Sequence, residues 1–550
     1  MAEQFSGQPL LRHDGSTVDG GDALKGKKVV GLLFSAMWCP SCKQFLPKIK
    51  KFYNEMQEAG KSFEIVLVSR DKEEDHMLEY LKEYNGNWLA IPFGDERIQE
   101  YLKKYEVPTI PAFKIIKSGG TLAVDKARFD VQDKAKEIGN LAKMSTLLNT
   151  EVTLDDVNHL TEKKILARLG PETGIKPIGA MGLQSVLGLI DPKWKTARGE
   201  RNSTLPKSFV LKIASPTGML NAFSEDISSF PAEHMEAMKQ CVDGFVAYLR
   251  PCHNTEVVFY EKVKEYHIDL PQIPKYYFGK PFEGESNKAF LAMEDLTKYQ
   301  VFSPITNLTK DQVEQSLTAL AQLQAKMMKL SDKDKTGFPH RDLSGLYGVL
   351  PDFALQLQNG IAAMIPHPAI APLTKKLAEI LPNIIKPEEI DKLPEKLGFE
   401  KVFVHGDFWP ANLMWNCQDG ETKLAKLIDF QMSYYGLAVC DIARLLNTSV
   451  DVESRRKNWK GFLEFYHSAF EKSLEKDQQM PFSVEQLEKT YQIVYPRITA
   501  YLLPAMLAVL KNAMKMPDSP QKAEAMGNLF GKFIAIYEDI ISMHEASKNL

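Results

Sequence analysis

Short apolar runs alternate with amphipathic stretches through roughly the first 140 residues, and this pattern predicts a small α/β domain. The runs Val29–Ser35 and Phe63–Ser69 predict two buried strands, with an amphipathic helix at residues 40–60 between them. A later run at Ala112–Lys117, a Ser-Gly-Gly turn and residues 122–129 predict a hairpin. Further helices are expected at residues 73–84, 96–105 and 133–143. The predicted domain has a parallel strand pair first and a hairpin last.

The pattern changes near residue 150, so we expect a domain at residues 1–145, a linker at 146–152 and a second domain at 153–550. TLDD at residues 153–156 predicts a helix N-terminus with acids in its first turn. Strands and turns follow to about residue 300, and mostly long helices follow after about residue 310. The apolar stretch 498–510 is shorter than the about 20 residues of a membrane span and predicts a buried helix.

Composition restricts the class of protein further. The chain has 550 residues, a net charge of -3 and 44% hydrophobic residues, which predicts several globular domains and no bulk attraction to nucleic acid. Residues 1–16 lack the apolar core of a secretory signal. Of six cysteines only Cys39 and Cys42 are close in sequence, which is typical of a reducing compartment. We therefore expect the cytoplasm, with the nucleus as an alternative.

The cysteine pair Cys39 and Cys42 follows a predicted strand and begins a predicted helix. Unpaired N–H groups and the positive end of the helix dipole stabilise a thiolate at such a place, and the second thiol is close enough to attack a mixed disulfide. A zinc site is the alternative, but no second CxxC exists to complete it. Two packed structural thiols are a further alternative. The context favours redox chemistry.

This first region resembles thioredoxins of the tryparedoxin and nucleoredoxin group through WCPSC, FEIVLVSRDKEED, NWLAIPFGDERI and VPTIPAFKII. The resemblance implies Cys39 as attacking thiol, Cys42 as resolving thiol, and Trp38 and a cis Pro111 as supports. It also implies a redox-active disulfide and a disulfide-containing protein or thiol reductant as partner. Pro-Ser separates the cysteines where the group has Pro-Pro, and Leu33 stands where thioredoxins proper carry a buried acid.

A protein-kinase catalytic loop is suggested by FPHRDLSGL at residues 338–346, but the details disagree. The fifth residue after Asp342 is Tyr347, where the motif requires Asn, and no apolar strand leads into it. A surface loop is the better interpretation. The stretch FVHGDFWPANLMW at residues 403–415 fits instead, because a strand precedes it and Asn412 is five residues after Asp407. A hairpin then returns to Asp429, which would bring Asn412 and Asp429 to one Mg²⁺.

Upstream segments supply the other parts of a phosphoryl-transfer site. LPKSFVLKI predicts a strand that carries Lys212 to the phosphates, with Glu256 as its partner and Glu261 as the rival. A glycine hairpin at residues 177–190 and a strand ending near residue 294 complete the nucleotide site. The residues expected to bind ATP are Gly179, Gly182, Ser185, Lys212, Glu256 and Glu294.

These motifs, with YYGLAVCDIARLL, resemble the CHK kinase-like (ecdysteroid-kinase-like) family, which is related to choline kinases and aminoglycoside phosphotransferases. The resemblance implies an α+β bilobal protein-kinase-like fold, with lobes at residues 153–297 and 298–550. It implies ATP and Mg²⁺, Asp407 as catalytic base, and Asn412 and Asp429 as metal ligands. His405 and Asp441 are expected to support the loop, and Trp409 and Gln431 are typical of the family.

The sequence therefore predicts an α/β thioredoxin-like domain fused to a kinase of small-molecule hydroxyls. The alternatives are a redox domain on a pseudokinase that only binds nucleotide or a partner, and a kinase regulated by Cys39 and Cys42. Helices after residue 445 are expected to form the acceptor pocket, and nearby aromatics could line it or belong to the core: Tyr434, Tyr435, Phe465 and Tyr466.

Overall fold

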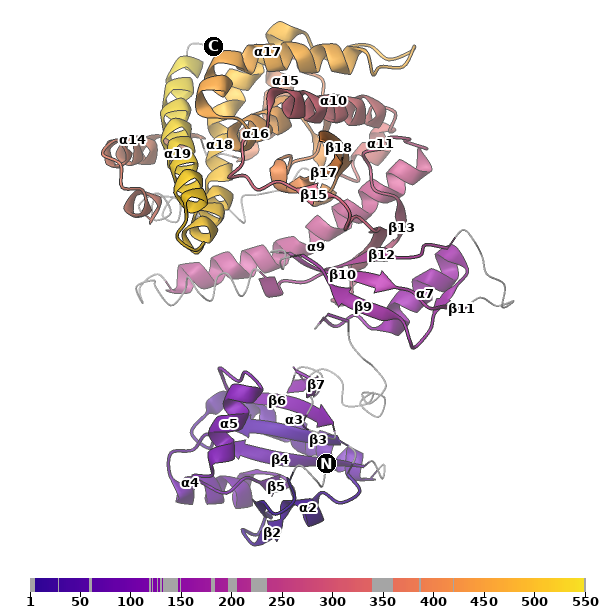
Figure 1. Ribbon diagram of the computed structural model, residues 1–550, viewed down its shortest axis with the longest axis vertical. Coiled ribbons are helices and arrows are strands. Elements are labelled where there is room, and N and C mark those ends of the chain that lie inside the picture. Colours follow the sequence, from indigo (N-terminus) through magenta and orange to yellow (C-terminus); the bar gives the residue numbers. More distant parts are fainter. Residues whose placement is uncertain are drawn as a thin grey trace. The chain divides into compact units, whose positions relative to one another are not determined.

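The computed structural model divides the chain into two compact units, Met1–Asn149 and Thr150–Leu550 (Figure 1). This division falls within the segment 146–152 that we expected to be the linker. The structure describes residues 5–548 except 28, 59–61, 118–119, 121, 126, 129–130, 132–146, 149, 180–183, 196–204, 219–234, 339–359, 385–386 and 419. Each unit is considered by itself below.

The first unit is built on a seven-stranded sheet with the order β2-β1-β5-β4-β3-β6-β7. Strands β3, β4 and β5 pair in parallel, whereas β6 and β7 add as an antiparallel hairpin. The predicted order of a parallel pair followed by a hairpin is confirmed. The strands are β1 Pro9–Leu11, β2 Thr17–Asp19, β3 Val29–Ser35, β4 Phe63–Ser69, β5 Leu89–Ala90, β6 Ala112–Lys117 and β7 Leu122–Val124.

Apolar side chains on both faces of this sheet explain why β3 is apolar along its whole length. Leu33 packs into one core cluster, while its neighbours Leu32 and Phe34 pack into another, because side chains alternate between the faces of a strand. The helices are α2 Gly20–Ala23, α3 Pro40–Glu58, α4 Glu74–Glu79 with a π-helical turn at Tyr80–Tyr84, and α5 Glu96–Lys104. The helix predicted at residues 133–143 lies wholly outside the described residues.

The first part of the second unit contains a five-stranded antiparallel sheet, in the order β13-β14-β12-β10-β9. The predicted glycine hairpin is the β9–β10 pair, and the strand that carries Lys212 is β12 at the centre. The long helix α9 and the shorter helix α7 belong to the same part (Figure 1). Their bounds are α7 Leu154–Ile165, β9 Gly174–Pro177, β10 Ser185–Asp191, β12 Phe209–Ala214, α9 Met235–Glu265, β13 Tyr276–Lys280 and β14 Phe290–Glu294.

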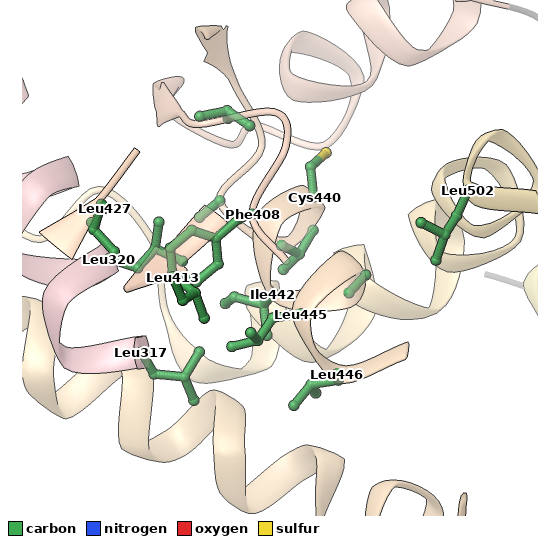
Figure 2. Packing of buried hydrophobic residues seen from close by; sticks show 14 of the residues in the cluster. Leu317, Leu320, Phe408, Leu413, Leu427, Cys440, Ile442, Leu445, Leu446 and Leu502 are labelled. Atoms are coloured by element: carbon green, nitrogen blue, oxygen red, sulfur yellow. The ribbon is translucent and has the colours of Figure 1, made fainter. Parts of the chain in front are cut away.

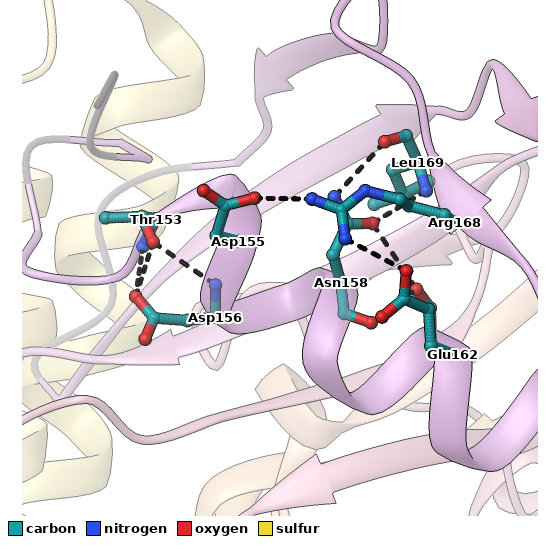
Figure 3. A network of polar contacts seen from close by, with 8 residues as sticks. Thr153, Asp155, Asp156, Asn158, Glu162, Arg168 and Leu169 are labelled. Carbon is teal, nitrogen blue, oxygen red and sulfur yellow. Dashed lines mark hydrogen bonds and ion pairs between the residues drawn. The ribbon is translucent and has the colours of Figure 1, made fainter. Parts of the chain in front are cut away.

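Helix α7 begins at the predicted cap. The hydroxyl of Thr153 accepts the N–H of Asp156, and the Asp156 carboxylate accepts the N–H of Thr153, which together form a capping box (Figure 3). Asn158 then exchanges two hydrogen bonds with the backbone of Leu169, at 2.7 Å and 3.2 Å, and so attaches the helix to strand β8 (Arg168–Leu169).

Short hairpins in the second half of this unit contain the expected motifs. Strand β16 (Val402–Val404) leads into the HGD loop, and β17 (Leu413–Gln418) returns through β18 (Glu421–Leu427), with Gly420 in the turn between them. Strand β19 (Tyr434–Gly436) pairs with β16, and β15 (Gln300–Val301) pairs with β17.

Long helices form the rest of the second unit, and α18 and α19 lie side by side (Figure 1). Phe408, the residue after Asp407, is fully buried beside Leu320, Leu413 and Leu427, which anchors the HGD loop in the core (Figure 2). The helices are α10 Lys310–Met327, α11 Asp332–Lys335, α14 Ile370–Ile384, α15 Pro387–Lys396, α16 Val439–Ser449, α17 Val452–Glu471, α18 Val484–Met514 and α19 Pro520–Ser547.

The apolar stretch 498–510 lies within α18, as predicted. Among the described residues no single helix has the length and apolarity of a membrane span, although the bent pair Val484–Leu503 and Ala505–Met514 passes that test by length and composition.

Candidate functional sites

The first candidate site is the cysteine pair at the start of α3. Cys39 and Cys42 form a disulfide, with Cα atoms 5.2 Å apart. The backbone N–H of Cys42 donates to Cys39 Sγ at 3.2 Å, and Sγ itself lies 3.8 Å from the carbonyl oxygen of Ile110. The sulfur of Cys39 therefore receives an N–H from the helix N-terminus, which is the interaction that stabilises a thiolate after reduction.

The surroundings of the pair fix its position. The peptide bond Ile110–Pro111 is cis, as the resemblance implied. Trp38 is 57% exposed and donates its indole N–H to the carbonyl of Arg70 at 3.1 Å. The N–H of Met37 donates to Asp71 Oδ1 at 2.8 Å. The loop after β4 thus holds the segment that precedes the cysteines. The position where thioredoxins proper carry a buried acid is occupied by Leu33, which is fully buried and has no ionisable group.

A zinc site was the alternative for Cys39 and Cys42, which the structure instead joins in a disulfide. Within the part of the chain that the structure describes, no group of three or more His, Cys, Asp or Glu side chains could hold a metal ion.

The second candidate site is centred on Lys212. Its Nζ lies 2.7 Å from Glu256 of α9 and 2.7 Å from Asp429, which is 217 residues further along the chain. Burial alone would lower the pKa of Lys212, but the two carboxylates overcome this effect and raise it above its ordinary value. The lysine is therefore protonated. Glu261, the rival partner, instead accepts from Tyr276 at 3.0 Å.

The HGD loop presents Asp407 with both carboxylate oxygens occupied. The side-chain N–H of Asn412 donates to Oδ2 at 2.8 Å, and Arg444 of α16 forms an ion pair with Oδ1. The backbone carbonyl of Asn412 accepts the N–H of Ile428 at 3.1 Å, which places Asn412 next to the strand end that carries Asp429. Gln431 donates to Asp429 Oδ2 at 3.3 Å.

A buried scaffold holds this loop. Asp441 accepts the backbone N–H of His405 at 2.7 Å and that of Gly406 at 2.9 Å, as a supporting residue should. Burial raises the pKa of Asp441 to about 7, although the two N–H donors oppose it. His405 is fully buried; its Nδ1 accepts the backbone N–H of Asp407 at 3.3 Å, and its Nε2 donates to the carbonyl of Ile428 at 3.1 Å. Burial lowers the pKa of His405 to about 4, so it is neutral at pH 7.

The structure describes some of the residues that we expect to bind ATP, but not all of them. Gly179 lies in the β9–β10 turn with a φ of +73°, and Ser185 begins β10. Gly182 lies outside the described residues. The carboxylate of Glu294 already binds Lys426 at 2.5 Å and the N–H of Lys275 at 2.8 Å, and its own N–H donates to the Lys275 carbonyl. The side chain and the N–H of Glu294 are therefore hydrogen-bonded within the second unit, and ATP binding by Glu294 stays a prediction.

The aromatic candidates for the acceptor pocket belong mainly to the core. Tyr466 is fully buried and donates to Gln324, and Tyr435 donates to the carbonyl of Met327 at 2.8 Å. Tyr434 and Phe465 are partly buried against the same core. The FPHRDLSGL motif lies outside the described residues except for Phe338, which is buried.

Arg444 is the site residue that sequence reasoning missed. It lies three residues after Asp441 on α16, so both side chains point from neighbouring positions on one helix face. A cation one turn after the expected support residue was the available signal. Its guanidinium carbon is 5.8 Å from the ring centroid of Trp409.

Comparison with known proteins gives two family matches. The model of a family designated DUF1679 and described as "Uncharacterized oxidoreductase dhs-27" matches residues 141–548, and that of a thioredoxin-like family matches residues 26–122. The first unit is thus a thioredoxin-like domain. A thioredoxin of known structure from Wuchereria bancrofti is 42% identical; the match covers 25% of this chain and 94% of that one, with a TM-score of 0.23.

Two curated relatives each match one part of the chain. Nucleoredoxin of Danio rerio is 36% identical over 132 residues, which is 24% of this chain and 30% of the nucleoredoxin. A Caenorhabditis elegans protein named "Uncharacterized kinase-like protein D1044.1" is 28% identical over 262 residues, which is 47% of this chain and 66% of that protein. The chain therefore spans less than two thirds of the length of either relative.

Proposed function

We propose, from the premise that this chain belongs to the DUF1679 family, that it joins two enzymes. The thioredoxin-like domain is a thiol–disulfide oxidoreductase, and the second unit is a bilobal kinase that transfers the γ-phosphoryl group of ATP to a hydroxyl of a small molecule. Both work in a reducing compartment, the cytoplasm or the nucleus. The kinase-like name of the Caenorhabditis elegans relative supports the second assignment.

Disulfide exchange uses the cysteine pair. The thiolate of Cys39 attacks one sulfur of a partner disulfide, and the other partner sulfur leaves as a thiolate. Cys42 then attacks Cys39 Sγ, which releases the reduced partner and closes the Cys39–Cys42 disulfide. A thiol reductant returns two electrons to the pair. Exposed Trp38 and the carbonyl of Ile110 border the sulfur that the partner must reach.

The observation that carries the kinase proposal is the pairing of Lys212 with both Glu256 and Asp429. A protonated lysine fixed by a helix carboxylate is the group that phosphoryl transfer requires at the phosphates, and a second carboxylate beside it suits a metal ion. Asp407 and Asn412 complete the set. Two buried N–H donors beside Asp407, Arg444 Nε and Trp409 Nε1, have no hydrogen-bond partner among the described residues, which suits a site for an oxygen-rich ligand.

The donor set also fits Mg²⁺. Asp429 offers a carboxylate and Asn412 an amide oxygen, and Mg²⁺ is bound in proteins by one or two such oxygen ligands together with phosphates. When bound, the ion would neutralise charge on the phosphates.

The remaining steps belong to the chain's own residues. Lys212 binds the phosphates, and Asp407 accepts a hydrogen bond from the acceptor hydroxyl and orients it. The bond from the acceptor oxygen to the γ-phosphorus forms while the bond to the β,γ-bridging oxygen breaks, and ADP leaves. The hydroxyl proton passes to Asp407 and then to water. His405 stays neutral and keeps the loop in place.

A pseudokinase is the second candidate, and one observation favours it. Arg444 and Asn412 occupy both oxygens of Asp407, as expected of a carboxylate that no longer meets a substrate. The family description names an oxidoreductase, but the matched residues begin at 141, after the cysteine pair. The described strands of the second unit pair antiparallel, unlike the parallel sheet of a dinucleotide-binding fold.

Incubation of the full chain with γ-³²P-labelled ATP, Mg²⁺ and a deproteinised metabolite extract tests the kinase. We expect label in organic phosphates from wild type and none from Asp407→Asn. Asp342→Asn, in the motif that sequence reasoning rejected, is the matched control and should retain activity. ATP binding without transfer by wild type would favour the pseudokinase.

Reduction of insulin disulfides tests the first domain. Cys39→Ser should abolish the reaction, whereas Cys42→Ser should accumulate a mixed disulfide through Cys39. Persistent reduction by Cys39→Ser would disprove the assignment.

A further inference from the structure

The carboxylate of Asp407 is held by two side chains that approach from different elements. Asn412, in the short helical turn after the loop, donates to Oδ2, and Arg444, on α16, pairs with Oδ1. The side chains of Asp407 and Arg444 are each 17% exposed. An ion pair at this depth is screened less than a surface pair, so it can fix the orientation of a carboxylate.

Arg444 is itself fixed. It extends from the helix whose Asp441 holds the backbone of the same loop. Its guanidinium carbon lies 5.8 Å from the ring centroid of Trp409, within the range of a cation–π contact. One helix therefore controls both the backbone of the HGD loop, through Asp441, and its reactive side chain, through Arg444.

We propose that Arg444 is a positioning residue for phosphoryl transfer: it keeps the Asp407 carboxylate aimed at the acceptor hydroxyl. The inference rests on the proposed kinase function. In a loose transition state the acceptor proton leaves late, so the orientation of the carboxylate matters more than its strength as a base. A carboxylate oxygen has several lone-pair directions, so Oδ1 or Oδ2 can still accept from a hydroxyl while bound to Arg444 or Asn412.

Positioning of Asp407 by Arg444 has a different consequence from inhibition of Asp407 by Arg444. If Arg444 only neutralised Asp407, its removal would free the carboxylate and raise transfer. If it positions Asp407, its removal lets the side chain rotate, and a misplacement of about 1 Å can cost on the order of 10²-fold in rate.

The test compares Arg444→Ala, Arg444→Lys and the control Arg456→Ala in the full chain. Arg456, on α17, is likewise a partly buried arginine in an ion pair, but its partners are Glu538 and Asp539 of α19. Transfer from γ-³²P-labelled ATP to the metabolite extract gives kcat, and titration with ATP and Mg²⁺ gives KM. Binding of a fluorescent ATP analogue reports whether each variant is folded.

We expect Arg444→Ala to lower kcat by about 10²-fold with KM for ATP changed by less than about threefold, since the contacts of Arg444 that the structure describes are with Asp407 and Trp409 and not with the proposed ATP residues. Arg444→Lys should lose about tenfold, because an ammonium ion retains the charge but lacks the planar fork. Millimolar guanidinium should partly restore Arg444→Ala and should leave Asp407→Asn inactive. Arg456→Ala should match wild type.

Three outcomes overturn the inference. Equal or faster transfer by Arg444→Ala would show a spectator or a block, and would leave the proposed kinase function intact. A loss in Arg444→Ala that guanidinium does not relieve, with Arg444→Lys fully active, would also contradict positioning by the fork. A wild type that binds ATP and transfers nothing overturns the kinase proposal, and the role of Arg444 with it.

Discussion

Gly406 and Gly420 have nearly the same backbone angle but opposite surroundings. Their φ values are +79° and +78°. A Cβ atom at Gly406 would lie 2.1 Å from the carbonyl oxygen of Met432, whereas one at Gly420 would meet open space. We predict that Gly420→Ala costs only the about 1 kcal/mol of a left-handed residue, and that Gly406→Ala costs about 3 kcal/mol or more and stops transfer.

Chemical unfolding of the full chain measures the free energy of unfolding of both variants. The relevant transition is that of the second unit, which contains both glycines. Similar losses for the two alanines would contradict the packing of Gly406 against Met432. The comparison cancels the backbone term, so the difference between the variants reports the steric contact alone.

Because two histidines are buried, we predict that the free energy of unfolding falls in acid. Burial lowers the pKa of His253 and of His405 to about 4, from an ordinary 6.5. Between these values the unfolded chain binds protons that the folded chain does not, so stability falls as pH falls from 6.5 to 4. At about 1.36 kcal/mol per pKa unit, each histidine accounts for about 3 kcal/mol at pH 4.

His253→Gln should flatten this part of the pH profile, because glutamine can still donate to the carbonyl of Lys280 but does not titrate. His159→Gln, at an exposed position, is the control and should leave the profile unchanged. Unfolding midpoints measured from pH 4 to 7 provide the test, and parallel profiles for wild type and His253→Gln would refute the assigned burial effect.

At this scale the sequence predicts residues whose spacing is dictated by one short motif. Asn412 and Asp407 are five positions apart and do bond to each other. The sequence pattern could not decide whether Glu256 or Glu261 is the partner of Lys212, because both lie on one helix and the lysine is more than 40 residues away along the chain. Arg444 was missed for a similar reason: its contact with Asp407 depends on how α16 packs, which spacing does not encode.

At the scale of elements, the capping box of α7 predicts a measurable difference between two substitutions. Thr153→Ala removes the hydroxyl that accepts the Asp156 N–H and should cost about 1 kcal/mol. Glu162→Gln breaks only the exposed pair with Arg168 and should cost no more than about 0.5 kcal/mol (Figure 3). Denaturant unfolding of the full chain measures the loss of stability in each variant. Equal costs would mean that the cap contributes no more than a surface ion pair.

Element prediction succeeded where burial on both faces leaves a continuous apolar run, as in β3 and β4. It failed at the edges of the first sheet. The short strands β1 and β2 carry few buried residues and were not predicted, and the strand predicted at residues 122–129 ends at Val124. Residues that pair only at an edge have little apolar signal, so their pattern resembles that of a loop.

At the scale of the whole molecule, each candidate site takes its residues from one unit. We therefore predict that the two activities can be removed separately. Cys39→Ser should abolish insulin reduction and leave phosphoryl transfer within about twofold, and Asp407→Asn should do the reverse, because sites that share no residues behave independently. Assays of both reactions on both variants provide the test; a transfer rate that depends on Cys39 would instead support redox regulation of the kinase.

The contact between Lys212 and Asp429 has a consequence for the order in which ligands bind. An ammonium group and a divalent cation compete for the same carboxylate, so a cation alone must displace the lysine and should bind weakly. Phosphates attract Lys212 and release Asp429 for the cation. Nucleotide and cation should therefore bind with positive coupling, and by thermodynamic reciprocity each must raise the affinity for the other by the same factor. Calorimetric titration of one ligand at several concentrations of the other measures that factor.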